Sequence, residues 1–263
     1  MEYGLTGKVA VVTGGSKGIG YATAKQFLLE GARVAICARH QEELTAAAEE
    51  LGTFGEIYWQ AVDATDDKAV YGFAQKVVER FGRLDIWVNN VGASVEKRGS
   101  EYTAEEIDWL TGVCFKSTVY GCQAAFRFMS NGGSIVNISS LAARCATVGR
   151  STLYGPLKSA VVGLSTTLAG EYAAYGIRVN AVLPGFTSTP KVKESIPEEE
   201  LNRNVLKTLL RRAAEPEEIA KPVVFLASDA ASYITASSLE VSGGHSVVLN
   251  PSYSYDCKEK QSE

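Results

Sequence analysis

One segment near the amino end limits the fold more than any other, because it joins a buried strand to a glycine-rich turn and a helix. Residues 8–13 (Lys-Val-Ala-Val-Val-Thr) form an apolar, β-branched run, which is typical of a strand buried on both faces of a parallel sheet. The turn 14–20 (Gly-Gly-Ser-Lys-Gly-Ile-Gly) follows at once, and residues 21–30 have an amphipathic pattern. Backbone N–H groups and a helix N-terminus bind phosphate in such a setting. The segment therefore predicts the phosphate-binding unit of an α/β fold.

Strand-like and helix-like segments alternate along the chain, which predicts parallel strands joined by right-handed helical crossovers. The 263 residues, 46% of them hydrophobic, contain no linker, repeat or break in composition, so we expect one domain over residues 1–263. The further strands are expected at 32–38, 56–62, 84–88, 133–138, 177–183 and 238–241, and the further helices at 41–51, 66–81, 103–129, 154–175 and 216–228.

Composition excludes several classes of protein. The net charge of −4 does not suit a nucleic-acid-binding protein, which usually carries a basic surface. No apolar run approaches the roughly 18–20 residues of a membrane span. The first residues do not resemble a signal peptide. Five scattered cysteines without a Cys-x-x-Cys pair favour a reducing compartment, and two histidines cannot build a His-rich metal site. We therefore expect a cytoplasmic protein without a metal centre.

Tyr154 and Lys158 stand four residues apart in an expected helix, so their side chains share one face. A phenol with a pKa of about 10 is a poor acid or base at neutral pH, but a nearby ammonium favours its phenolate form. Ser140 ends the preceding strand and is suited to hold a carbonyl oxygen against the tyrosine. Pro156 is tolerated only in a first helical turn, so the helix should begin close to Tyr154. Taken alone, the spacing also fits an ordinary surface pair.

The end of the second strand indicates which cofactor would bind. An acid near this point usually receives the ribose hydroxyls of NAD, and none is present. Arg39 follows the strand instead, and Lys17 stands in the glycine turn. Two cations at one point suit a 2′-phosphate, so we predict NADP(H) over NAD(H). The alternative is that both are solvated surface cations.

Two other strand ends carry polar side chains that suit a cofactor cleft. Asp63 follows the third strand and has two possible roles, an acceptor for an adenine amine or a cap for the helix near Asp66. The fourth strand ends in Asn89-Asn90-Val91-Gly92, where amides can brace the sheet and the glycine allows a close backbone approach.

The glycine turn also matches a hydrolase motif. Gly14-x-Ser16-x-Gly18 has the form of the nucleophile elbow, and His245 lies late in the chain as that mechanism requires. The elbow normally follows a middle strand, however, and it does not explain Gly20. We therefore favour the phosphate-binding interpretation.

The last third of the chain contains a flap and a tail. The flap covers about 190–214, and residues 197–212 carry one apolar stripe that suits either core packing or a lid over substrate. The tail, about 245–263, is polar and contains tyrosines, so we expect it to be flexible or to contact a partner. The stripe consists of Leu201, Val205, Leu206, Leu209 and Leu210.

Together these motifs resemble the short-chain dehydrogenase/reductase family, and its tropinone-reductase-like members in particular, from about Leu5 to Gly244. The matching pieces are Thr13-Gly14-x-x-x-Gly18-x-Gly20, Asn89-Asn90-Val91-Gly92, Ser140, Tyr154-x-x-x-Lys158, and Pro184-Gly185 with Thr189. The resemblance implies a single doubly wound Rossmann-type α/β domain with a seven-stranded parallel sheet. It also implies hydride transfer between a nicotinamide cofactor and a small-molecule ketone, aldehyde or alcohol, in an enzyme that is commonly a homotetramer.

The resemblance assigns roles to individual residues. Tyr154 would be the general acid/base, Lys158 would lower its pKa and bind the nicotinamide ribose, and Ser140 would bind the substrate oxygen. Thr189 and the backbone around Thr187 would hold the carboxamide. The full cofactor-binding set that we expect is Gly14, Ser16, Lys17, Gly18, Ile19, Gly20, Arg39, Asp63, Asn90, Gly92, Tyr154, Lys158, Pro184, Gly185, Thr187 and Thr189.

One departure from the family pattern bears on the chemistry. Cys114 stands where the family has an asparagine that bends the helix and holds a proton-relaying water, and a thiol is a weak donor and acceptor. Isomerisation, dehydration or C=C reduction with the same Tyr and Lys therefore remains an alternative, as does a cofactor-binding protein with little activity. The substrate pocket is expected to involve Ser94, Glu96, Cys145, Val148, Phe186 and the flap.

Overall fold

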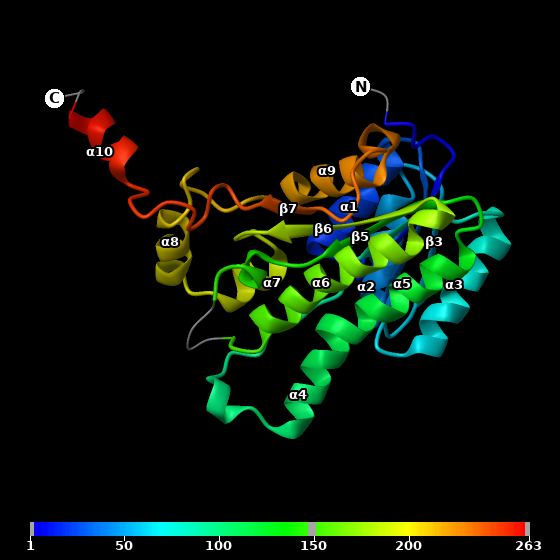
Figure 1. The fold of residues 1–263 in the computed structure, drawn as a ribbon, viewed down its shortest axis with the longest axis horizontal. Coiled ribbons are helices and arrows are strands. Elements are labelled where there is room, and N and C mark those ends of the chain that lie inside the picture. Colours follow the sequence, from blue (N-terminus) through cyan, green and yellow to red (C-terminus); the bar gives the residue numbers. More distant parts are fainter. Residues whose placement is uncertain (1–2, 147–150, 261–263) are drawn as a thin grey trace.

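A seven-stranded parallel sheet forms the centre of the computed structural model, which describes residues 3–146 and 151–260 (Figure 1). The strand order is β3-β2-β1-β4-β5-β6-β7, so the chain winds outward from β1 in both directions and the predicted doubly wound fold is confirmed. The strands are β1 (Val9–Thr13), β2 (Arg33–Ala38), β3 (Ile57–Ala61), β4 (Ile86–Asn89), β5 (Gly133–Ile138), β6 (Ile177–Pro184) and β7 (Ser238–Val241).

Helices cover both faces of this sheet. One apolar layer contains residues of α1, α2 and α9, and the other contains residues of α3, α5 and α6. Within β1, Ala10 and Val12 enter the first layer and Val9 and Val11 the second, which explains why the strand has no polar alternation. The helices are α1 (Gly18–Leu29), α2 (Gln41–Leu51), α3 (Asp67–Phe81), α4 (Ala104–Thr111), α5 (Ser117–Phe128), α6 (Tyr154–Tyr172), α7 (Pro190–Ser195), α8 (Glu198–Leu206), α9 (Pro216–Ala227) and α10 (Tyr253–Lys260).

The predicted helix 103–129 is not a continuous α-helix. A π-helical turn, Gly112–Lys116, separates α4 from α5 and contains Cys114. The helix 154–175 begins at Tyr154 as expected, although its last three residues form a 3₁₀ turn. Helix α1 begins at Gly18 rather than at residue 21, because the glycines after Lys17 form its first turn.

The flap folds into α7 and α8, and the stripe residues Leu209 and Leu210 follow α8. The interpretation that the apolar stripe packs into the core is wrong. None of the described residues of α8 is buried, and Leu206 and Leu210 are more than half exposed. The tail ends in α10, far to the left of the sheet in Figure 1, and it contacts the flap. The Tyr255 hydroxyl donates to the Leu209 carbonyl at 2.6 Å, and Arg211 donates to the Ser252 hydroxyl at 3.0 Å.

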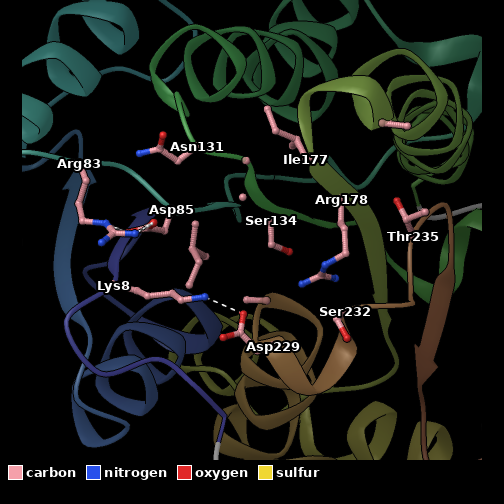
Figure 2. A pocket seen from close by; sticks show the side chains of 16 residues that line it. Lys8, Arg83, Asp85, Asn131, Ser134, Ile177, Arg178, Asp229, Ser232 and Thr235 are labelled. Atoms are coloured by element: carbon pink, nitrogen blue, oxygen red, sulfur yellow. Dashed lines mark hydrogen bonds and ion pairs between the residues drawn. The ribbon is translucent and has the colours of Figure 1, made fainter.

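At the amino edge of the sheet, a polar pocket of about 480 Å³ contains two ion pairs (Figure 2). Lys8 and Asp229, which are 221 residues apart in the chain, approach to 2.6 Å, and Arg83 binds Asp85 through two hydrogen bonds. Asp85 also accepts from the backbone N–H of Val9. These contacts fasten β1 to its neighbours, and none of the predicted site residues lies here.

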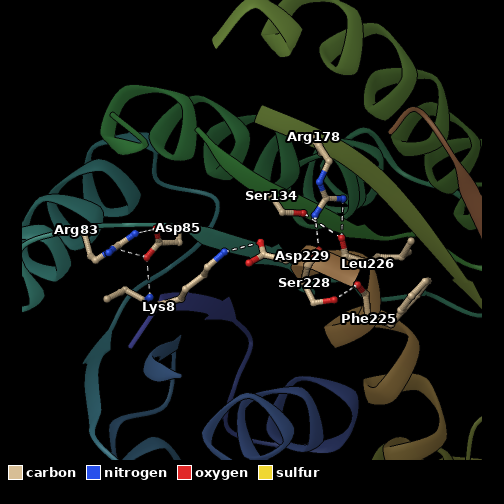
Figure 3. Close-up of polar contacts among 10 residues, drawn as sticks. Lys8, Arg83, Asp85, Ser134, Arg178, Phe225, Leu226, Ser228 and Asp229 are labelled. Atoms are coloured by element: carbon tan, nitrogen blue, oxygen red, sulfur yellow. Dashed lines mark hydrogen bonds and ion pairs between the residues drawn. The ribbon is translucent and has the colours of Figure 1, made fainter. Parts of the chain in front are cut away.

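Arg178 of β6 completes this edge (Figure 3). Its guanidinium donates to the carbonyls of Leu226, Ser228 and Ile234 at 2.8–3.0 Å. Leu226 and Ser228 lie at the carboxyl end of α9, where helix carbonyls lack intrahelical partners and the dipole is negative. Arg178 is therefore a structural cap for α9.

Candidate active site

The Tyr154, Lys158 and Ser140 side chains meet at the carboxyl end of β5. Tyr154 is the first residue of α6, and Lys158 lies one turn later with its Nζ 5.8 Å from the tyrosine ring centroid. Lys158 is only 2% exposed, and its ammonium donates to the Ile138 carbonyl at 2.9 Å. The Ser140 side chain is hydrogen-bonded to Tyr154 and accepts from the Ala142 N–H at 3.1 Å. The structure thus brings the three predicted catalytic residues together.

Burial controls the charge of both ionisable groups. It raises the pKa of Tyr154 to about 12, against a smaller lowering by the Ser140 hydrogen bond. It lowers the pKa of Lys158 from its ordinary value. The expected lowering of the tyrosine pKa by the lysine does not dominate here, because desolvation opposes both charged forms. At neutral pH the phenol is protonated and has a proton to give.

The π-helical turn places Cys114 beside this pair. Its thiol donates to the Ala93 carbonyl at 2.9 Å, and its side chain is buried. A charge on this sulfur would raise the pKa of both Tyr154 and Lys158. Helical π turns often mark functional positions, and this one contains Cys114, the residue that stands where the family has its helix-bending asparagine.

A cleft of about 540 Å³ lies along the carboxyl edge of β1, β2, β3 and β4. It collects most of the predicted cofactor residues, but Tyr154 and Lys158 do not line it, Gly20 lies behind the turn, and Pro184, Gly185 and Thr187 lie at the end of β6. The predicted residues that line it are Gly14, Ser16, Lys17, Gly18, Ile19, Arg39, Asp63, Asn90, Gly92 and Thr189.

Glycines keep this cleft open at three points. A Cβ on Gly20 would lie 2.2 Å from the Gly14 carbonyl oxygen, so only glycine permits the tight turn. Gly14 has a φ of 65°, which disfavours other residues. A Cβ on Gly92 would lie 3.0 Å from Lys158 Nζ, in the space between the cleft and the catalytic pair.

Asparagine side chains hold the strand ends in place. Asn90 donates to the carbonyls of Thr13 and Gly14, which fixes the glycine turn against β4. Asn89 donates to Asn137 of β5 at 2.8 Å inside the sheet. These contacts match the predicted bracing role of paired amides.

Asp63 and Thr189 also occupy the cleft. Asp63 binds the N–H and hydroxyl of Thr65, while Asp66 caps α3. The helix-capping role considered for Asp63 is therefore performed by Asp66. Thr189 caps α7 by accepting from Val192.

The structure changes the environment predicted for Lys17. Its ammonium lies 2.8 Å from Glu43 of α2, so it does not face the cleft as an unpaired cation. Arg39 is exposed at the mouth of the cleft with His40 beside it. Sequence reasoning missed Glu43, although its position in the first turn after β2 was the signal that could have found it.

The hydrolase interpretation and the predicted substrate pocket do not gain support. His245 is not among the residues that line the cleft with Ser16. Ser94, Glu96, Cys145 and Phe186 do not line the cleft, and Val148 lies outside the described residues. Thr65, Trp109, Lys191 and Glu194 are among the lining residues that were not predicted.

The donors in the cleft fit a dinucleotide. Backbone N–H groups at the N-terminus of α1 suit a diphosphate, and the glycine clearances allow its close approach. Within residues 3–146 and 151–260, no cluster of His, Cys, Asp and Glu is placed to hold a metal ion. In the same part of the chain, no helix is long and apolar enough to cross a membrane.

Comparison with known proteins identifies the family. The family model described as enoyl-(acyl carrier protein) reductase matches residues 14–246. The chain is 35% identical to a 3-oxoacyl-(acyl-carrier-protein) reductase of Chlamydia pneumoniae over 93% of its length and 99% of that protein's. It is 36% identical to a tropinone reductase homologue of Arabidopsis thaliana, covering 94% of this chain and 95% of the relative.

A solved structure agrees with these relatives. A mutant short-chain dehydrogenase/reductase of Serratia marcescens superposes with a TM-score of 0.87 at 34% identity, covering 92% of this chain and 99% of that one. The chain therefore belongs to the short-chain dehydrogenase/reductase family of oxidoreductases, which implies a nicotinamide cofactor.

Proposed function

We propose that this enzyme is an NADP(H)-dependent carbonyl reductase or alcohol dehydrogenase. The observation that carries the proposal is the meeting of Ser140, Tyr154 and Lys158 beside a glycine-lined cleft, in which Gly92 separates the cleft from Lys158. A ketone or aldehyde oxygen held between Ser140 and Tyr154 would accept a proton from the phenol. The nicotinamide cofactor supplies the hydride when bound.

The chain's own residues perform the proton chemistry. The phenol of Tyr154 is protonated at neutral pH because burial raises its pKa to about 12, so it can act as a general acid toward a carbonyl oxygen. Ser140 orients that oxygen through its hydroxyl. Lys158 would bind the nicotinamide ribose, and its ammonium favours the phenolate left after proton transfer.

The remaining cofactor contacts follow from the cleft. The turn from Gly14 to Gly20 would bind the diphosphate, Asp63 the adenine amine, and Asn90 and Gly92 the central part of the cofactor. Pro184, Gly185, Thr187 and Thr189 would hold the carboxamide. Arg39 and Lys17 at the cleft mouth support a 2′-phosphate, since no acid ends β2.

A second candidate function is reduction of a C=C bond. The matching family model is named for an enoyl reductase, whereas the relatives reported above are named as keto and tropinone reductases. Cys114 stands where the family has its proton-relaying asparagine, and this difference also favours a reaction other than carbonyl reduction. Polar recognition by the Ser140 hydroxyl favours the carbonyl substrate.

Two assays test the proposal. A panel of ketones, aldehydes and enoyl compounds is incubated with NADPH, and cofactor absorbance is followed. Turnover of ketones but not enoyl compounds is expected; the reverse result would establish the second candidate. Tyr154→Phe should lower turnover at least hundredfold while leaving the Kd for NADPH within about threefold. Retained turnover would exclude Tyr154 as the general acid.

We also propose that the enzyme is a homo-oligomer. Helix α4 exposes Ile107 and Trp109, each 42% accessible, on the segment through which family members commonly associate. Light scattering after size-exclusion chromatography should give a mass of two or four chains. A monomer at micromolar concentration would contradict this proposal.

A further inference from the structure

The Lys17–Glu43 ion pair lies where the proposed 2′-phosphate would bind. Lys17 precedes α1, and Glu43 stands in the first turn of α2, so two separate helices bring the groups to 2.8 Å. Both residues line the cofactor cleft. The contact lowers the pKa of Glu43, which is therefore a carboxylate throughout the neutral range.

This carboxylate opposes the ligand that the neighbouring cations favour. A 2′-phosphate carries about −1.5 to −2 charges near neutral pH. Arg39 and His40 are exposed at the same mouth of the cleft, and Glu43 is the acid that is paired with Lys17 there. Lys17 cannot give its full charge to a phosphate while it pairs with Glu43.

The pair is weak enough to be exchanged. The two side chains are 57% and 42% exposed, and ion pairs of this kind contribute little to stability because water and salt screen them. Lys17 can therefore turn from the carboxylate to a phosphate without disturbing the fold. Glu43 would then remain as an unpaired negative charge near the bound anion.

We propose that Glu43 determines cofactor specificity by competing with the 2′-phosphate for Lys17. The competition reduces the preference for NADP(H) over NAD(H) below what Lys17 and Arg39 alone would provide. This inference rests on the proposed NADP(H) site. It makes Glu43 an acid that weakens phosphate binding, rather than an acid that receives ribose hydroxyls.

The test compares two substitutions in the same helical turn. Glu43→Gln removes the competing charge and keeps the side-chain shape. Glu42→Gln removes a charge from the same first turn of α2, but Glu42 is exposed and does not line the cleft. Calorimetry gives the Kd of 2′,5′-ADP and of 5′-AMP, and fluorescence gives the Kd of NADPH and of NADH.

Glu43→Gln should bind 2′,5′-ADP and NADPH about three- to tenfold more tightly at low salt, because one screened charge repulsion is removed. Binding of 5′-AMP and NADH should stay within twofold, as should every ligand with Glu42→Gln. In a Lys17→Met background, the gain from Glu43→Gln should fall by at least half, because the competition for Lys17 is gone.

Unchanged or weaker 2′,5′-ADP binding in Glu43→Gln would overturn the inference, and so would an equal gain for 5′-AMP. The proposed cofactor preference fails separately, if the wild-type chain binds NADH as tightly as NADPH. Tight NADPH binding by the wild type with no effect of Glu43→Gln would leave the proposed function intact and exclude Glu43 as the competing group.

Discussion

Replacing Lys158 by methionine should separate stability from function. The ammonium is 2% exposed and has the Ile138 carbonyl as its hydrogen-bond acceptor, and burial lowers its pKa. Methionine has a similar length and no charge, so the substitution removes the cost of burying an ion while filling the same space.

The magnitude follows from two opposed contributions. An effective desolvation penalty of several kcal/mol per buried ion is relieved. A hydrogen bond to a charged group, about 1.5–3 kcal/mol, is lost. We expect Lys158→Met to be about 1–2 kcal/mol more stable than the wild type, which raises Tm by roughly 2–6 °C in a domain of this size.

The gain should depend on pH. A lysine whose pKa is lowered in the folded state costs stability below its unfolded pKa of about 10.4, and the cost disappears above that pH. The Tm difference between the variant and the wild type should therefore be largest near pH 7 and shrink toward pH 10.5. Lys76→Met, an exposed control in α3, should change stability by no more than about 0.5 kcal/mol.

Thermal unfolding with and without NADPH provides both readouts. Saturating ligand at 100 times its Kd stabilises a protein by about 2.7 kcal/mol, and Lys158→Met should lose most of this increment. A cofactor-free Tm below that of the wild type would refute the reasoning, because it would mean that the buried ammonium is compensated by more than one carbonyl.

Four further outcomes are expected. Cys114→Asn should hold or raise kcat if the thiol occupies the relay position; a large loss would give the thiol a role of its own. In the cofactor-free chain, the tyrosinate absorbance of wild type minus Tyr154→Phe should show a midpoint near 12 rather than about 10, because burial opposes the phenolate; a midpoint below 10 would contradict this. Arg178→Met should lower stability by about 2–4 kcal/mol in a denaturant titration, since three carbonyls lose a charged donor, with an unchanged Kd for NADPH. Gly20→Ala should abolish NADPH binding measured by fluorescence, since its Cβ would lie 2.2 Å from a carbonyl oxygen, whereas Gly72→Ala in α3 meets open space and should stabilise the fold by about 0.5–1 kcal/mol.

The sheet was predictable because its strands are continuous apolar runs with polar or glycine-rich ends. Every strand lies within two residues of its expected bounds, and the helix of Tyr154 starts where Pro156 requires. Local patterns also placed the glycine turn after β1 and Ser140 after β5, and these positions share one edge because the carboxyl ends of parallel strands lie together.

What the sequence did not predict depends on contacts between distant residues. The π-helical turn accompanies a bond from Cys114 to Ala93, and neither residue indicates the other by spacing. The pairing of Lys17 with Glu43 joins two helices at the cleft mouth. Helix α10 lies in a polar segment with no apolar periodicity, so the sequence pattern did not predict a helix there.

The two edges of the sheet divide stability from chemistry. At the amino edge, Lys8 and Asp229 are paired and Arg178 satisfies carbonyls, so each charge there has a partner and the pocket holds the fold together. At the carboxyl edge, glycines leave space for a ligand. Burial there disfavours the charged forms of both Tyr154 and Lys158. Burial of these groups lowers the stability of the cofactor-free protein. A bound ligand that supplies hydrogen-bond partners to them should therefore stabilise the fold. Substitutions at the amino edge should therefore lower Tm without changing cofactor affinity, whereas Lys158→Met at the carboxyl edge should raise Tm and weaken cofactor binding.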